Sequence, residues 1–331
     1  MSYVEYFSLE REPFSNAPDA RFYYDSDQHS QALVRLMYAV NSNKGLAVLV
    51  GGVGAGKTTL ARRMLDTLDE ANYESSMLVM VHSSINPEWI LTRIAMQLGV
   101  HEPASDRLSV LKQLYERLLE IDEQGRRAVI LIDEAQMLQS RELMEEFRGL
   151  LNLEIPGKKL LNIIFFGLTE LEDCLKLDEP LAQRVAVKYQ LKSMTVETTT
   201  AYIHHRLAIA GGKVDLFDNE AIDAIHRFAG GVPRLINTIC DNCLFESFML
   251  KVHAVGPKIV HSVAGDLGLL QRPASSLPEA FQDLPETPVV DEAATEVETE
   301  EVPATETASE EYESFEGLDE IESMLDRLEL K

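Results

Sequence analysis

The chain has 331 residues, 45% of them hydrophobic, which is enough to bury a core spread over two packed units. No apolar run approaches the roughly 18 residues of a membrane span, and the start MSYVEYFSLEREPF lacks the basic and apolar regions of a signal peptide. Three cysteines are too few for a disulfide framework, so we expect a cytoplasmic protein with free thiols rather than a secreted or membrane-spanning one.

Charge is unevenly distributed along the chain. The net charge is −25, and residues 271–331 alone carry 19 acidic and 3 basic side chains. The rest of the chain still holds 36 acidic against 27 basic residues. Bulk charge therefore does not favour a nucleic acid, and binding one would need a local basic patch. We expect no nucleic-acid partner.

Short β-type runs alternate with longer helical patterns over the first half of the chain. The expected strands are 46–50, 77–81, 128–132, 161–166 and 185–191, and the helices between them are 58–68, 87–98, 108–121 and 142–151. This alternation predicts an α/β fold in three layers, with a parallel sheet between helices. We assign residues 1–192 to this α/β base.

Beyond residue 191 the strand patterns fade. Helices are expected at 196–210, 219–228, 232–252 and 258–269, which together predict a helical lid domain at 193–270. From 271 to 331 the sequence is rich in Pro, Glu, Thr, Ala and Ser, a composition that predicts a disordered acidic tail.

Near the end of this tail, apolar residues recur at spacings of three and four. They are Leu318, Ile321, Leu325 and Leu328. The spacing indicates one amphipathic stripe, which favours a short docking helix at 317–330. A weakly helical, solvated tail explains the pattern equally well.

A glycine-rich run follows the first expected strand and opens the first expected helix. It consists of Gly51, Gly52, Val53, Gly54, Ala55, Gly56, Lys57, Thr58 and Thr59, and it matches the P-loop pattern G-x4-G-K-[ST]. The glycines let backbone N–H groups face phosphate oxygens, and the helix adds its positive N-terminal end. We expect Lys57 to bridge the β- and γ-phosphates and Thr58 to bind Mg²⁺. ATP and Mg²⁺ are therefore the expected cofactors.

The strand expected at 128–132 ends in two carboxylates, Asp133 and Glu134. Asp133 can hold Mg²⁺ directly or through water, and Glu134 can orient and polarise an attacking water. A strand and helices lie between this motif and the P-loop, which indicates the additional-strand branch of P-loop ATPases. The two motifs together predict ATP hydrolysis.

Two arginines are candidates for contacting the γ-phosphate. Arg184 lies just before the last expected strand, and an arginine supplied by a neighbouring subunit can raise the rate by about 10³ to 10⁵. Arg234, in Gly230-Gly231-Val232-Pro233-Arg234, opens a helix of the lid and could report the nucleotide state. An ordinary surface salt bridge is the alternative for each arginine.

The aromatic residues near the start of the chain are candidates for the adenine side of the pocket. They are Phe14, Phe22, Tyr23 and Tyr24, and we expect His29 to lie close to the same pocket. Core packing explains the aromatic residues equally well.

Several blocks of residues between about 3 and 250 carry a resemblance to a known family. Besides the P-loop, they are Tyr6-Phe7-x-Leu9, Pro13-Phe14, Pro18-Asp19-x-Arg21-Phe22, Leu131-Ile132-Asp133-Glu134-Ala135-Gln136, Arg148-x3-Asn152-Leu153-Glu154, Tyr202-Ile203-x2-Arg206-Leu207 with Gly211, and Gly230-Gly231-x-Pro233-Arg234-x2-Asn237. In this order they resemble the ExeA/GspA-type ATPases of the AAA+ superfamily, which serve bacterial secretion and pilus systems and include the MSHA-pilus biogenesis ATPases.

The resemblance implies a ring-forming ATPase, commonly a hexamer, that uses nucleotide to assemble an envelope machine. It implies that Arg184 is the finger and Arg234 the second sensor. The implied partners are further copies of the chain and inner-membrane secretion or pilus components, for which the acidic tail is a candidate docking segment. We therefore expect a cytoplasmic protein, peripheral to the inner membrane at most.

The chain departs from the family pattern in two places. Family members usually read Gly-Gln-Pro-Glu-Leu after the fourth strand, whereas this chain reads Gly167-Leu168-Thr169-Glu170-Leu171. This leaves Thr169 as the nearest hydroxyl for the first-sensor position. The second departure is the acidic tail, which stands where some members have a membrane span and a periplasmic domain.

Two other functions stay open from the sequence. One is a DNA-acting ATPase resembling the transposition regulators, which share the same core. The other is a nucleotide-gated scaffold, in which ATP binding assembles the ring, the tail recruits a partner and turnover is secondary.

Overall fold

A computed structural model describes residues 2–17, 19–82 and 85–270. These residues all belong to one compact unit, Met1–Leu284. The acidic tail expected at 271–331, with its amphipathic stretch, lies outside the described residues.

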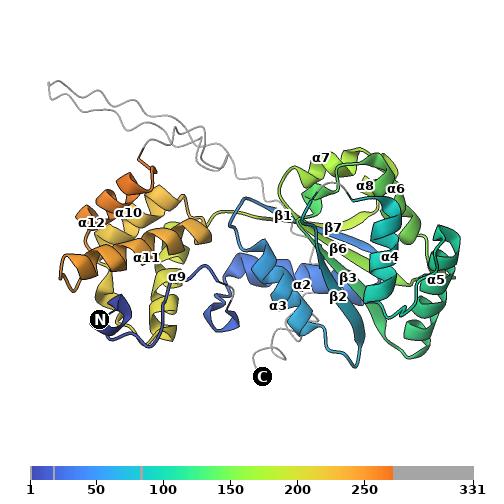
Figure 1. Ribbon diagram of the computed structural model, residues 1–331, viewed down its shortest axis with the longest axis horizontal. Coiled ribbons are helices and arrows are strands. Elements are labelled where there is room, and N and C mark those ends of the chain that lie inside the picture. The colour runs from blue at the N-terminus through green and yellow to red at the C-terminus, as the bar shows by residue number, and fades with distance from the viewer. Residues whose placement is uncertain (1, 18, 83–84, 271–331) are drawn as a thin grey trace, which may run out of the picture. The chain divides into compact units, whose positions relative to one another are not determined.

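Five parallel strands form the central sheet. They are β1 (Leu46–Gly51), β2 (Tyr73–Val79), β3 (Arg127–Asp133), β6 (Leu161–Gly167) and β7 (Val185–Leu191), in the order β2-β3-β6-β1-β7 (Figure 1). The predicted α/β fold is confirmed. Strand β2 starts at Tyr73 rather than at residue 77, because this edge strand is only partly buried and its first residues are mostly polar.

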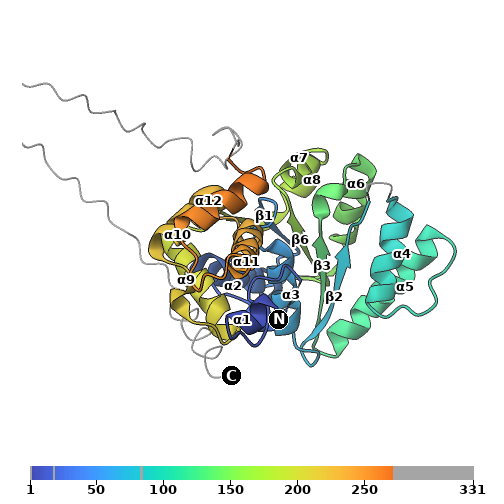
Figure 2. The same ribbon diagram turned by 60° about the vertical axis from the view of Figure 1, so that its left-hand side comes forward.

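The side chains of β1 alternate between two cores. Leu46, Val48 and Val50 pack into one core, while Ala47 and Leu49 pack into the other. The first core is covered by α4 (Pro87–Gln97), α5 (Arg107–Glu123), α6 (Arg141–Leu150), α7 (Leu171–Lys176) and α8 (Glu179–Ala182), and the second by α2 (Asp27–Asn41) and α3 (Lys57–Thr67). Figure 2 shows α4 and α5 on one side of the sheet and α2 and α3 on the other. Burial on both faces explains the continuous apolar runs of the strands.

Helix α2 was not predicted from the sequence. It spans Asp27–Asn41, and its buried residues are His29, Ala32, Leu36, Met37, Ala39 and Val40. Two of these are alanines and one is a histidine, so the apolar stripe is weak in the sequence although the helix packs closely on β1 and β7.

The remaining short elements connect these layers. They are α1 (Tyr3–Tyr6), the hairpin strands β4 (Glu154–Ile155) and β5 (Lys158–Lys159), and the 3₁₀ turns η1 (Ala20–Phe22), η2 (Ala135–Met137) and η3 (Val214–Leu216).

Between the last strand and residue 270, the structure describes four helices, as expected. They are α9 (Val196–Ile209), α10 (Asn219–Ala229), α11 (Pro233–Met249) and α12 (Pro257–Asp266). Cys240 and Cys243 are fully buried in their shared core, so their spacing reflects helix packing. None of the helices in the described part of the chain is long and apolar enough to cross a membrane.

The N-terminal segment packs against these four helices rather than against the sheet. Phe7, Leu9, Phe14 and Phe22 all belong to the helical core. Core packing, one of the two alternatives from the sequence, is therefore confirmed for Phe14 and Phe22. The domain boundaries at 192 and 270 stay a prediction, since this early segment contributes to the later core.

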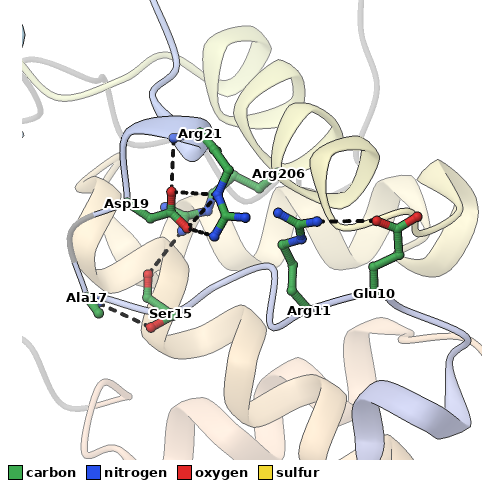
Figure 3. Close-up of polar contacts among 7 residues, drawn as sticks. All are labelled: Glu10, Arg11, Ser15, Ala17, Asp19, Arg21 and Arg206. Atoms are coloured by element: carbon green, nitrogen blue, oxygen red, sulfur yellow. Dashed lines mark hydrogen bonds and ion pairs between the residues drawn. The ribbon is translucent and has the colours of Figure 1, made fainter.

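Arg206 of α9 holds this segment in place. Its guanidinium donates to the carbonyl oxygens of Pro13 (2.6 Å) and Ser15 (3.0 Å) and to the Tyr202 hydroxyl (2.8 Å). Figure 3 shows Arg206 beside the segment that carries Ser15, Ala17 and Asp19. Only 6% of Arg206 is exposed, and these bonds offset the cost of burying its charge. The Tyr202-to-Leu207 block of the family resemblance is therefore structural.

Candidate active site

The glycine-rich run forms a tight loop between β1 and α3. Gly54 (φ 77°) and Gly56 (φ 96°) adopt the left-handed conformation that favours glycine. The Lys57 ammonium donates to the carbonyl oxygens of Gly51 and Gly52, both at 2.9 Å. Burial lowers the pKa of Lys57, and the nearby carboxylates of Glu134, Asp133 and Glu170 act in the opposite direction. The exposed face of the loop is formed by Gly52, Val53 and Thr59.

Thr58 and Asp133 meet although 75 positions separate them in the chain. The Thr58 hydroxyl donates to Asp133 Oδ2 at 2.7 Å, and Asp133 Oδ1 accepts from the Glu134 amide at 3.0 Å. Asp133 ends β3, and β6 separates that strand from β1. Because parallel strands end at one edge of the sheet, both motifs lie at the carboxyl edge. Burial raises the pKa of Asp133.

The Thr58–Asp133 pair fits Mg²⁺. Both donors are oxygen atoms, which this hard cation prefers, and Mg²⁺ is usually bound by one or two carboxylates together with waters and substrate phosphates. Among the described residues no group of three or more His, Cys, Asp and Glu side chains is placed to hold a metal. The protein thus offers part of a coordination shell, which nucleotide phosphates would complete.

Glu134 stands at a strained backbone position. Its φ of 55° and ψ of 36° are left-handed values that a non-glycine residue rarely adopts. Its carboxylate accepts from the Gln136 amide at 2.5 Å. Thr169, the first-sensor candidate, is exposed, and its hydroxyl donates to Glu170 at 3.2 Å. The structure therefore brings Gln136, and not Thr169, to Glu134.

His29 lies under the phosphate loop. Its Nδ1 is 2.7 Å from Ser26 Oγ, and the ring is hydrogen-bonded to the Ala55 backbone. A Cβ atom placed on Gly56 would lie 3.0 Å from His29 Nε2. The imidazole thus supports the loop at its phosphate end, a role that the sequence pattern did not indicate.

Arg234 also reaches the phosphate loop. Its amide donates to the Gly54 carbonyl at 3.4 Å, and a Cβ atom on Gly54 would lie 2.8 Å from Arg234 Cβ. Helix α11 begins at Pro233, so its N-terminal turn lies beside the loop. The second-sensor candidate is placed next to the P-loop of its own chain.

Arg184 lies at the opposite edge of the sheet. Strand β7 pairs with β1 from Val185 opposite Leu46 onward, so Arg184 precedes the strand while the P-loop follows β1. A strand rises about 3.3 Å per residue, which separates Arg184 from the loop of its own chain by roughly 16 Å along β1. The structure does not bring Arg184 to that site.

Two residues of the family block at 148–154 hold Arg184. Its guanidinium donates to Asn152 Oδ1 at 2.6 Å and to the Arg148 carbonyl at 3.1 Å. Arg148 in turn pairs with the buried carboxylate of Asp178 at 3.1 Å. The candidate finger is thus fixed by its own chain while only partly buried.

Comparison with known proteins gives two sequence matches. Residues 40–175 match a family described as an AAA domain. The chain is also 35% identical over 270 residues to general secretion pathway protein A of Aeromonas hydrophila, which covers 81% of this chain and 47% of that protein. The chain thus spans about half the length of this relative.

Solved structures share the fold at low identity. Cdc6p from Pyrobaculum aerophilum superposes with a TM-score of 0.62 at 16% identity, covering 80% of this chain and 75% of that chain. The ORC2 protein of Aeropyrum pernix, solved in ADPNP-ADP complexes, gives 0.58 at 15% identity, covering 78% and 72%. The sheet order, the phosphate loop and the match at residues 40–175 identify a P-loop protein with an AAA domain. Within that class, the match to general secretion pathway protein A agrees with the ExeA/GspA resemblance of the sequence.

Proposed function

We propose that this protein binds ATP with Mg²⁺, hydrolyses it, and thereby drives or regulates assembly of a bacterial envelope machine. The observation that carries the enzymatic part is the convergence of Lys57, Thr58, Asp133 and Glu134 at one edge of the sheet. The sequence relation to a general secretion pathway protein supports a secretion system as the machine, with a pilus or surface-polymer exporter as related possibilities.

Each site residue has a proposed role. Lys57 and the backbone amides of the loop bind the β- and γ-phosphates, and Thr58 and Asp133 hold Mg²⁺. When bound, Mg²⁺ would neutralise charge on the phosphates. Glu134 orients and polarises the attacking water as a general base. Arg234 would sense the nucleotide from its place beside Gly54.

Arg184 is proposed to act on the site of a neighbouring copy. Its position at the amino edge of the sheet keeps it from its own phosphate loop, whereas the contacts with Asn152 and Arg148 hold it in a fixed direction. A ring, with six copies as the expected number, would bring each Arg184 to the next site. Such an arginine contributes by stabilising charge on the transferred phosphoryl group.

Steady-state hydrolysis of Mg²⁺-ATP tests the enzymatic part. We expect Lys57→Ala to lower turnover by at least about 100-fold, because the ammonium that faces the phosphates is lost. The matched control is Lys112→Ala on α5, where the lysine is exposed and pairs with Glu116. Substantial hydrolysis by Lys57→Ala would contradict the assignment of the ATPase site to this loop.

Activity in cells separates the proposed function from its two alternatives. If turnover drives assembly, both Lys57→Ala and Glu134→Gln abolish the machine's function. If the protein is a nucleotide-gated scaffold, Glu134→Gln preserves function and Lys57→Ala does not. The DNA-acting alternative predicts hydrolysis stimulated by duplex DNA. The expectation that nucleic acid is not a partner, and the placement at the cytoplasmic side of the inner membrane, remain part of this proposal.

A further inference from the structure

We propose that Gln136 is a positioning residue, which aims the Glu134 carboxylate and links it to the loop that follows β6. This inference rests on the proposed ATPase activity. At the end of β6 the chain has Leu168 and the exposed Thr169, so the sequence left open which polar side chain lies at this strand end. Gln136 is such a side chain.

The Gln136 side chain bridges two elements of the site. Its Nε2 donates to Glu134 Oε2 at 2.5 Å, and its Oε1 accepts from the Leu168 amide at 3.0 Å. A carboxylate can only accept and a backbone amide can only donate, so the orientation of the side-chain amide follows from its partners. One amide therefore connects the end of β3 to the end of β6.

The surroundings hold Gln136 in this position. Only 5% of the residue is exposed, and its own carbonyl accepts from the Cys174 thiol at 3.6 Å. A Cβ atom on Gly167 would lie 3.0 Å from Gln136 Oε1 and 2.9 Å from the Leu171 side chain. The glycine that ends β6 thus leaves the space that the amide occupies.

The bridge matters because a glutamate has three rotatable side-chain bonds. Glu134 already holds a left-handed backbone conformation, which directs its side chain from the strand end. The charge-assisted bond from Gln136 restricts the remaining rotations and keeps the carboxylate oriented towards one partner. A general base contributes fully only when its geometry is fixed relative to the water it activates. Movement of the β6 loop would pass to Glu134 through the same amide.

The test compares two substitutions with a matched control. Gln136→Met keeps the volume of the side chain and removes both hydrogen bonds. Gln136→Glu keeps the shape and the acceptor but replaces the donor with a second carboxylate. The control, Gln113→Met, removes a similar bridge far from the site, in which the amide bonds the Glu102 carbonyl (3.1 Å) and the Ala104 amide (2.9 Å).

The measurements are kcat and KM for Mg²⁺-ATP, with binding stoichiometry from a fluorescent ATP analogue. We expect both Gln136 variants to lose about 10- to 100-fold in kcat, as is typical for residues that orient a reacting group. KM and the number of sites should stay within about twofold, and Gln113→Met should keep the kcat of the original protein.

Each outcome decides the inference. If kcat stays within about twofold of the original in either Gln136 variant, the amide does not position Glu134 and the inference is wrong. A lower kcat with an equal loss of binding sites indicates a damaged fold, and then the isosteric Gln136→Glu decides. If the original protein itself hydrolyses no ATP, the proposed function fails instead.

Discussion

Two neighbouring threonines occupy different surroundings at the phosphate site. The Thr58 hydroxyl donates to the buried Asp133, whereas Thr59 is exposed at the loop. Only Thr58 is therefore placed to become a ligand of Mg²⁺ beside the aspartate. This difference makes the pair a natural comparison.

Thr58→Ala is expected to lower Mg²⁺-dependent hydrolysis by about 10- to 100-fold and to raise the Mg²⁺ concentration required for half-maximal rate. Thr59→Ala should leave both quantities close to the original values. A titration with Mg²⁺ at fixed ATP measures them. Equal effects of the two substitutions would contradict the assignment of Thr58.

His29 couples the phosphate loop to pH. Burial lowers the pKa of His29 below its ordinary value of 6.5, and the Ala55 backbone and Asp25 oppose this only in part. As the pH falls below 6.5, the unfolded chain takes up a proton that the folded imidazole resists. The free energy of unfolding therefore decreases from about pH 6.5 down to the lowered pKa of the folded state.

His29→Gln should reduce this acid sensitivity, because an amide has no proton to take up over that range. The quantity to measure is the difference in Tm between pH 7.5 and pH 5.5. We expect a smaller difference in His29→Gln than in the original protein, and none of that reduction in His101→Gln, a change at an exposed histidine. A difference unchanged in His29→Gln would contradict the prediction.

Among the elements, the turn between α10 and α11 depends on a close backbone approach. Gly231 has φ of 67°, and a Cβ atom there would lie 2.2 Å from the Met194 carbonyl oxygen. Met194 in turn donates its amide to the Gly231 carbonyl at 2.8 Å. The turn thus ties the start of α11, and with it Arg234, to the segment that follows β7.

Gly231→Ala is expected to reduce the free energy of unfolding by about 3 kcal/mol, since it adds overlap with backbone to a left-handed conformation. Gly125→Ala is the matched control, with φ of 75° and nothing within 4 Å of the added Cβ. That change should cost only about 1 kcal/mol. Denaturant unfolding compares the two, and similar losses would show that the contact with Met194 is unimportant.

Several elements could be predicted because their signal is local. The three central strands, β1, β3 and β6, are apolar runs that the two cores bury, and helices α6 and α10 follow clear periodicity. Helix α2 was missed, and half of its buried stripe is small or polar. The packing of the N-terminal segment was missed because its partners lie nearly 200 residues away. Contacts of this kind depend on tertiary structure and leave no periodic trace.

The site shows the same division. The P-loop, Asp133 and Glu134 could be predicted because the residue types and spacing within each short motif indicate its chemistry. Gln136 could not, since its role depends on which strand ends lie beside it. For His29 the sequence indicated a place near the pocket, but not its contacts with the phosphate loop. The assigned roles of all these residues stay predictions until they are measured.

At the scale of the whole molecule, the role proposed for Arg184 requires a second copy, because this arginine lies at the end of the sheet opposite its own phosphate loop. Activity should therefore depend on assembly. Asn152 and Arg148 already fix the guanidinium within one chain. The interface would then need to bring Arg184 of one copy to the phosphate loop of the next.

Mixing two inactive variants tests this dependence. Lys57→Ala keeps Arg184 but lacks a working loop, and Arg184→Ala keeps the loop but lacks the finger. Lys57→Ala alone should lose at least about 100-fold in kcat and Arg184→Ala about 10³-fold, and a mixture should recover part of the activity. Arg141→Ala is the control, because that arginine is exposed and pairs with Glu145 of its own helix. A mixture no more active than its components would argue against a shared site.

The most direct measurement identifies the nucleotide that remains on the protein after incubation with Mg²⁺-ATP and gel filtration. Glu134→Gln should retain intact ATP, because the loop and the Mg²⁺ ligands remain while the base is lost. Lys57→Ala should retain no nucleotide, and the original protein should retain ADP or release it. Retention of ADP by Glu134→Gln, or of ATP by Lys57→Ala, would contradict a single site in which Lys57 binds and Glu134 hydrolyses.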